Sequence, residues 1–363
     1  MHTGATFSLK VSRLSCGAML AVMLIHSSDI VVGVDVVTWE TVLLHFVGSS
    51  LTSWAVPYFF VVSGFFFWKS RDIWSNGLVA WKMTLRKKAR TLLVPYLFWC
   101  IIGAVCVLPL IVWSNHVAGR GLFERTFIQS GTIWGSIVDC FGLDVTPRGN
   151  VPLWYVRALL SIFILSPLFV FVIRRMKWGG FCLACACAFV SPFLSIPFVT
   201  YQVRGLGYFY FGMMLSEYAW VKGHVPKKAV AVSGILVLLL FVDDLIWHKC
   251  TVFLPVALMS FIWGFYDFIP RFHKESTLPM WMRWTFWVYC LHILPTGYLL
   301  AIGRALFGKT NRIAVLLMFI IPLLVLSFSL VIGMCVNRFF PKVFGLLTGG
   351  RGCNSPERKV YKC

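Results

Sequence analysis

The segment RLSCGAMLAVMLIHSSD, residues 13–29, decides the fold class, because its apolar run suits a helix that crosses a membrane. It begins with Arg13 and ends with the titratable residues His26 and Asp29. On a helix His26 and Asp29 share a face, so the carboxylate could orient the imidazole. Ionisable groups inside a membrane are functional candidates. The structural alternative makes Arg13 a topology anchor and His26 an interfacial polar residue.

The composition of the chain indicates an integral membrane protein. Hydrophobic residues make up 59% of the sequence and charged residues 13%, with a mean hydropathy of +0.82, whereas a soluble domain has about one quarter charged residues. Hydropathy predicts an all-α bundle of about ten transmembrane helices. The predicted spans lie near residues 13–33, 43–68, 91–113, 152–173, 179–199, 201–219, 229–247, 250–269, 284–303 and 313–336.

The distribution of Lys and Arg predicts the topology. With the N terminus inside, most of the 33 basic residues fall in inner segments, as expected when basic loops are retained in the cytoplasm. Both termini are therefore predicted to be cytoplasmic. We expect one membrane domain over residues 1–340 and a short basic cytoplasmic tail over residues 341–363.

Two other classes of site are disfavoured by the sequence. The net charge of +20 is not accompanied by a basic domain or nucleic-acid-binding motif, so we expect no nucleic-acid partner. The run CLACAC, residues 182–187, clusters cysteines without a nearby histidine or carboxylate. We therefore expect small residues packing between helices there, and no metal site.

Further charged and polar residues within the spans are candidates for a ligand site. The candidate substrate-binding or supporting residues are Trp154, Tyr155, Arg204 and His292. Arg157 follows Trp154 and Tyr155 near the start of a span, where a guanidinium needs an anion or carbonyl groups. Its alternative role is snorkelling to the interface, and Arg204 invites the same two interpretations. His292 could line the cavity of the first-span histidine, or could be a core histidine hydrogen-bonded within the bundle.

The basic run RKKAR, residues 86–90, is interpreted first as a topology determinant and a contact for anionic lipid. It would also attract the phosphates of a cofactor that arrives from the cytoplasm. Arg13, at the inner boundary of the first span, would face the same side. The candidate cofactor-binding residues are therefore Arg13, Arg86, Lys87, Lys88 and Arg90.

Six segments in order carry a family resemblance, and they cover about residues 10–300. They are VMLIHSS, VPYFFVVSGFFFWKS, RKKARTLLVPYLFW, VPLWYVRALLSIFILSPL, RGLGYFYFGMML and FWVYCLHILP. Together they resemble acyltransferase family 3, membrane-bound O-acyltransferases that acylate cell-surface glycans and related acceptors.

The resemblance implies roles for individual residues. His26 matches the histidine taken as catalytic in the family, and Arg157 matches an arginine after an LWF-like motif. The family's arginine stands eleven residues before its histidine, where this chain has Ser15; Arg13 precedes His26 by thirteen. Thirteen steps of about 100° turn Arg13 some 220° from His26, so it shares that face only if the helix is unwound or bent.

The implied reaction moves an acyl group, usually acetyl, from acyl-CoA to a carbohydrate hydroxyl in the inner (plasma) membrane. His26 would be the general base, Asp29 would orient it, and Arg157 would stabilise the oxyanion. Partners would be the bilayer, acyl-CoA as co-substrate, and a carbohydrate or lipid-linked glycan acceptor, with no permanently bound cofactor. The alternative is a secondary transporter that uses the same His, Asp and Arg groups for a proton or anion pathway.

Overall fold

The computed structural model describes residues 3–28, 38–70, 77–117, 133–143, 146–190, 203, 205–218, 225–246, 253–269, 278–308 and 310–351, and all regular structure within them is helical. In the first half of the chain the helices are α1 (Thr3–Ser28), α2 (Trp39–His45), α3 (Ala55–Lys69), α4 (Leu78–Lys88), α5 (Val94–Val117), α6 (Ile133–Phe141), α7 (Trp154–Ile164) and α8 (Ser166–Met176). In the second half they are α9 (Trp178–Val190), α11 (Leu206–Glu217), α12 (Lys227–Ile246), α13 (Leu254–Tyr266), α15 (Met280–Arg283), α16 (Thr285–Leu291), α17 (Ile293–Phe307), α18 (Asn311–Phe339) and α19 (Pro341–Leu347). Two π-helical stretches, η1 (Phe46–Ser50) and η3 (Ala89–Leu93), and the 3-10 turn η4 (Val151–Leu153) adjoin these helices.

The all-helical membrane architecture is confirmed, but the predicted count of about ten spans is not. Within the described residues, five helical segments are long and apolar enough to cross a membrane, and the number rises to seven if each of two bent helix pairs forms one span. The five segments are Phe7–Ser28, Trp39–Lys69, Val79–Val107, Lys227–Ile246 and Asn311–Phe339. The predicted spans near 179–199, 201–219 and 250–269 coincide with the shorter helices α9, α11 and α13.

Helix α11 shows why hydropathy alone does not determine the number of spans. A helix that is apolar on all sides can face lipid or lie in a protein core, and hydropathy does not separate the two. Phe209, Met213 and Met214 of α11 are completely buried inside the protein, and Tyr210 is nearly so. The described part of α11 is therefore an interior helix of 12 residues.

Helices α3 and α11 pack at very short distance through two glycines. A β-carbon at Gly64 of α3 would collide with the carbonyl oxygen of Phe209, and one at Gly212 of α11 would collide with that of Val61. Small residues allow helix backbones to approach in this way in membrane proteins. Since α3 and α11 also bury their aromatic side chains against each other, this contact is a rigid centre of the fold.

Replacing Gly64 by alanine is therefore expected to destabilise the protein by about 3 kcal/mol, because overpacking against a backbone cannot be relieved by a rotamer change. Thermal unfolding of the detergent-solubilised protein measures this effect. Gly179→Ala is the matched control, because its β-carbon would meet its nearest neighbour at an ordinary 3.8 Å. Equal unfolding temperatures for the two variants would contradict the close packing.

Two bends bring polar groups into the interior. Helices α7 and α8 meet at 67°, where Pro167 cannot donate to the carbonyl of Phe163 and the hydroxyl of Ser166 donates to it at 2.7 Å. Helices α16 and α17 meet at 49° around His292. Pro295 of α17 lacks the N–H that a straight helix would direct back to residue 291, which explains the break. His292 therefore lies at the break between the two helices.

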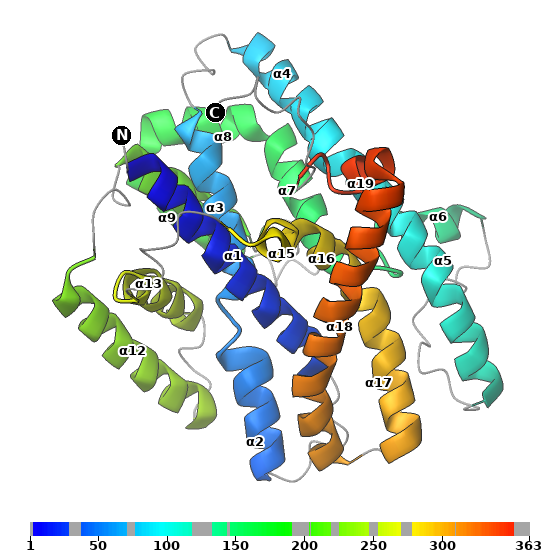
Figure 1. Cartoon of the computed structure of the whole chain (residues 1–363). Helices are drawn as coiled ribbons and strands as arrows, with labels where there is room; N and C mark the ends of the chain where they lie inside the picture. The colour runs from blue at the N-terminus through cyan, green and yellow to red at the C-terminus, as the bar shows by residue number, and fades with distance from the viewer. Residues whose placement is uncertain are drawn as a thin grey trace.

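The beginning of α1 and helix α19 lie toward the same end of the bundle, as do α4 and α8 (Figure 1). The assignment of this end to the cytoplasm remains a prediction. The predicted tail from residue 341 begins with α19, in which Phe344 is completely buried against Trp284 and Trp287. Trp99 of α5 also donates to the carbonyl of Leu347 at 3.0 Å. This part of the segment packs with the membrane domain, and residues 352–363 lie outside the described residues.

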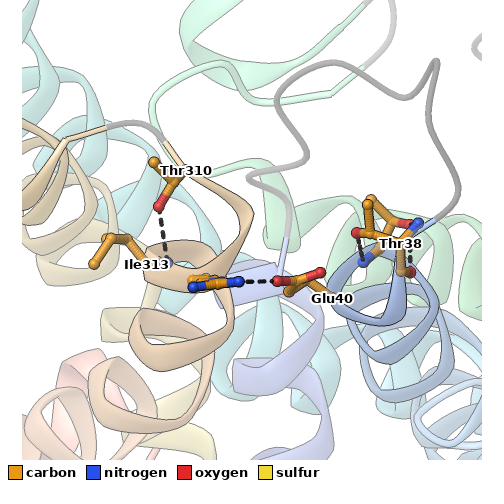
Figure 2. A network of polar contacts seen from close by, with 6 residues as sticks. Thr38, Glu40, Thr310 and Ile313 are labelled. Carbon is orange, nitrogen blue, oxygen red and sulfur yellow. Dashed lines mark hydrogen bonds and ion pairs between the residues drawn. The ribbon is translucent and has the colours of Figure 1, made fainter.

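The beginnings of α2 and α18 are fixed near each other by a polar network (Figure 2). Thr38 caps α2 and Thr310 caps α18 by accepting from the Ile313 amide at 3.3 Å. Arg312 donates to Glu40 at 3.2 Å, but its side chain is 81% exposed. An ion pair with one solvated partner stabilises little, so the main effect of this pair is to orient the two helix starts.

Candidate active site

Two histidines from distant parts of the sequence meet inside the bundle. The ring centres of His26 on α1 and His292 at the α16–α17 break lie 5.3 Å apart. His26 is half-buried, whereas His292 is completely buried. The fold thus places the predicted catalytic histidine and the predicted supporting histidine side by side.

The hydrogen bonding of His292 defines its tautomer. Its Nδ1 lies 2.6 Å from the carbonyl oxygen of Tyr289. Because a carbonyl only accepts, Nδ1 carries the hydrogen, and in the neutral ring Nε2 keeps its lone pair. Nε2 is buried and has no hydrogen-bond partner among the described residues. His292 therefore presents a buried acceptor beside His26.

Two tyrosines continue the site from the histidine pair. The Tyr289 ring lies 6.1 Å from His292 and 6.1 Å from the predicted substrate residue Tyr155. The Tyr289 hydroxyl donates to the carbonyl of Pro152. The Tyr155 hydroxyl donates to the carbonyl of Phe59 at 3.1 Å and lies 3.0 Å from the Ser63 hydroxyl. These bonds tie Tyr155 of α7 to α3, and Tyr289 of α16 to η4.

A cavity of about 530 Å³ reaches these tyrosines, and we call it the arginine cavity. Tyr155 and Tyr289 belong to its lining, together with Arg283 at the end of α15 and Arg351 after α19. Its other lining residues include the hydroxyl and aromatic side chains of Ser12, Ser15, Phe59, Ser63, Thr285 and Phe286. The cavity therefore carries two arginines and several hydroxyl side chains among apolar residues, and Tyr289 in its wall adjoins His292.

Arg13 lies on a different face of α1 from the cavity-lining serines. Helix α1 is continuous from Thr3 to Ser28, so the bend or unwinding that would turn Arg13 toward His26 is not present. Arg13 is buried and donates to the hydroxyl of Tyr266 on α13 at 3.0 Å. The cavity is lined instead by Ser12 and Ser15. This agrees with the rotation expected from the spacing of thirteen residues.

We expect Arg13 to join α1 to α13. Arg13→Gln and Tyr266→Phe should each lower the free energy of unfolding by about 1.5–3 kcal/mol, because each removes a buried charged hydrogen bond. The double variant should cost little more than either single one, since both remove the same contact. Thermal unfolding checks the stability effects. Loss of catalytic activity in Arg13→Gln, at unchanged stability, would contradict this role.

The other predicted residues occupy several environments. Arg157 is buried on α7 and lies near Tyr96 and Cys100 of α5. The Trp154 ring packs 6.2 Å from the ring of Phe60. Neither Arg157 nor Trp154 lines the arginine cavity. Asp29 and Arg204 lie outside the described residues.

The basic run also stays outside the cavity lining. The side chains of Arg86, Lys87 and Arg90 are exposed. The ammonium group of Lys88 instead lies 4.0 Å above the Phe163 ring, in a cation–π arrangement. The structure thus does not bring the predicted cofactor-binding residues together around one space.

Residues that the sequence did not single out complete the site. Arg283 and Arg351 line the cavity, although both counted only as topology or tail charges in the sequence. Asn150 is completely buried before α7 and donates to the carbonyl of Cys290 at 2.8 Å. A possible sequence signal was the GGR run at residues 349–351, because paired glycines indicate a specific backbone path.

Comparisons with known proteins match most of the length of the chain. The profile of an acyltransferase family, described as an acyltransferase domain, matches residues 16–336. The chain is similar to the succinoglycan biosynthesis protein ExoH of Rhizobium meliloti (strain 1021), with 24% identity over 325 residues, covering 84% of this chain and 81% of the relative. No solved structure matches the chain. The profile range includes His26 and His292, and Arg351 lies beyond it.

Proposed function

The chain belongs to the acyltransferase 3 family, and from this premise we propose that it is an integral membrane O-acyltransferase acting on a carbohydrate in the inner (plasma) membrane. It transfers an acyl group, acetyl in the first instance, from acyl-CoA to a hydroxyl of a cell-surface, exported or lipid-linked glycan. His26 is the general base. The observation that carries this proposal is the position of His26 within the matched domain, beside a second buried histidine.

The acceptor class is supported by the similar relative. ExoH is a succinoglycan biosynthesis protein by name, and succinoglycan is a polysaccharide. Helices suited to crossing a membrane agree with an enzyme that meets its donor from one side and its acceptor from the other. We therefore place the acceptor among the glycans that a cell exports or displays.

The chemistry requires a base at the acceptor hydroxyl. A sugar hydroxyl is a weak nucleophile at neutral pH, so His26 takes its proton as the oxygen attacks the thioester carbonyl. The new C–O bond forms the ester, the C–S bond breaks, and the proton passes from His26 to the departing thiolate. The products are the acylated glycan and coenzyme A.

Three further residues assist His26 in this proposal. The lone pair of His292 Nε2 accepts a hydrogen bond from His26 after a small rotation of the rings, which fixes the tautomer of the base. Arg157 stabilises the developing oxyanion. Asp29 orients His26 from the segment after α1, as expected from its spacing.

The proposal is tested with membrane vesicles, acetyl-CoA labelled in the acetyl group, and isolated glycan. Label should appear in alkali-labile glycan esters, with release of one coenzyme A thiol per ester. The transporter alternative predicts substrate-dependent proton flux without consumption of acyl-CoA. Flux without labelled ester, using glycan from the same cells, would overturn the proposed function.

A further inference from the structure

We propose that the arginine cavity binds the phosphate groups of the acyl donor through Arg283 and Arg351. This inference rests on the proposed function and identifies the donor site of that activity. Both guanidinium-bearing residues line one cavity of about 530 Å³. No aspartate or glutamate belongs to this lining within the described part of the chain. A cavity lined by charges of positive sign alone attracts anions. The planar guanidinium group of arginine matches the geometry of a phosphate group.

Arg351 is held in the cavity wall by a specific backbone path. Gly349 and Gly350 adopt φ values of 61° and 75°, which other residues rarely adopt. A β-carbon at Gly349 would also collide with the carbonyl group of Thr91 in η3. This approach lets Arg351 donate to that carbonyl at 2.9 Å, while its guanidinium carbon lies 4.2 Å from the centre of the Phe286 ring. The chain therefore fixes a cation at the cavity.

Arg283 supplies the second charge from a different element. It ends α15 directly before Trp284 and α16, and its side chain is exposed at the cavity. Ser12, Ser15 and Thr285 line the same space, where the hydroxyls of Ser15 and Thr285 donate to the carbonyls of Val11 at 2.8 Å and Met282 at 2.9 Å. The two arginines are therefore the principal donors, and two guanidinium groups suit a ligand with more than one phosphate group.

The shape of the site gives the ligand a direction. Ser15 lines the cavity. His26 lies eleven residues further along α1, which is roughly 16 Å along the helix axis at a rise of 1.5 Å per residue. Tyr155 and Tyr289 line the cavity, and the Tyr289 ring also lies 6.1 Å from the ring of His292. With its phosphates bound by the arginines, the donor would extend its pantetheine arm past the tyrosines. The thioester would then arrive beside His26.

Binding to the full-length protein in nanodiscs of neutral lipid tests this assignment. The probes are coenzyme A and pantetheine, which lacks phosphate groups. We expect Arg283→Gln and Arg351→Gln each to weaken coenzyme A binding about tenfold, and the double variant about a hundredfold, with pantetheine affinity changed less than twofold. Arg175→Gln is the matched control, an exposed arginine on α8 outside the cavity lining. Arg351→Lys, which keeps the charge, should lose less affinity than Arg351→Gln.

Three results would overturn the assignment. The first is unchanged coenzyme A affinity in both variants; if wild-type membranes still form glycan esters, only the donor site is wrong. The second is an equal loss of coenzyme A and pantetheine affinity, which would indicate structural damage. The third is coenzyme A binding by none of the proteins, with arginine-dependent binding of phosphatidylglycerol in doped nanodiscs. That outcome assigns the cavity to lipid headgroups and removes acyl-CoA from the proposed function.

Discussion

His26→Ala is expected to lower kcat for acyl transfer by about 10²–10⁴-fold, the usual contribution of a general base. The protein should still insert and fold, because α1 keeps the buried side chains Met19, Val22 and Met23 that pack in the core. The measurement is ester formation from labelled acetyl-CoA by equal amounts of purified wild type and variant. Size-exclusion chromatography and thermal unfolding confirm that both are folded.

His45→Ala is the control for this experiment. His45 is a half-exposed histidine on α2, and its Nε2 lies 3.2 Å from the carboxylate of Asp244 on α12. Its replacement should change transfer less than threefold. Near-normal transfer by His26→Ala would show that another group takes the proton from the acceptor.

The second prediction concerns His292, whose two ring nitrogens can be imitated separately. Asparagine keeps a donor near the Nδ1 position for the carbonyl of Tyr289, and glutamine keeps an acceptor near the Nε2 position. If His292 positions His26 through Nε2, we expect His292→Asn to lower kcat by about 100-fold, with the KM for acyl-CoA changed less than threefold. His292→Gln should recover about tenfold of this loss. Steady-state kinetics of ester formation measure both constants.

A purely structural role for His292 makes the opposite prediction. The bond from Nδ1 to Tyr289 helps to hold the break between α16 and α17. If only this bond mattered, His292→Asn would be the milder variant, and loss of activity would follow loss of thermal stability. That order of the two variants would remove His292 from the proposed positioning of His26.

The sequence predicted the class of the fold better than its internal arrangement. The apolar run before His26 identified the first span, and α1 covers it as a continuous helix. Hydropathy could not distinguish α11 from a membrane span, because burial by protein and burial by lipid select the same residues. The contact through Gly64 and Gly212 depends on how two helices meet, which a single segment does not encode.

The candidate site could be predicted only in part, because some of its features depend on one helix and others on how distant helices pack. Helical geometry correctly placed Arg13 on a different face from His26, since it needs only the angle per residue. The approach of His292 to His26 was only one of two interpretations, because it depends on tertiary packing and on the break before Pro295. Arg351 was assigned to a tail, since its position results from the packing of α19.

The most direct test of the account is mass spectrometry of surface glycans, before and after mild alkaline release of esters. The cells compared lack the gene or are complemented with wild type or His26→Ala at equal membrane abundance. The account predicts an ester that disappears with the gene and returns only with wild type. The same esters in every strain would contradict an O-acyltransferase acting on surface glycans.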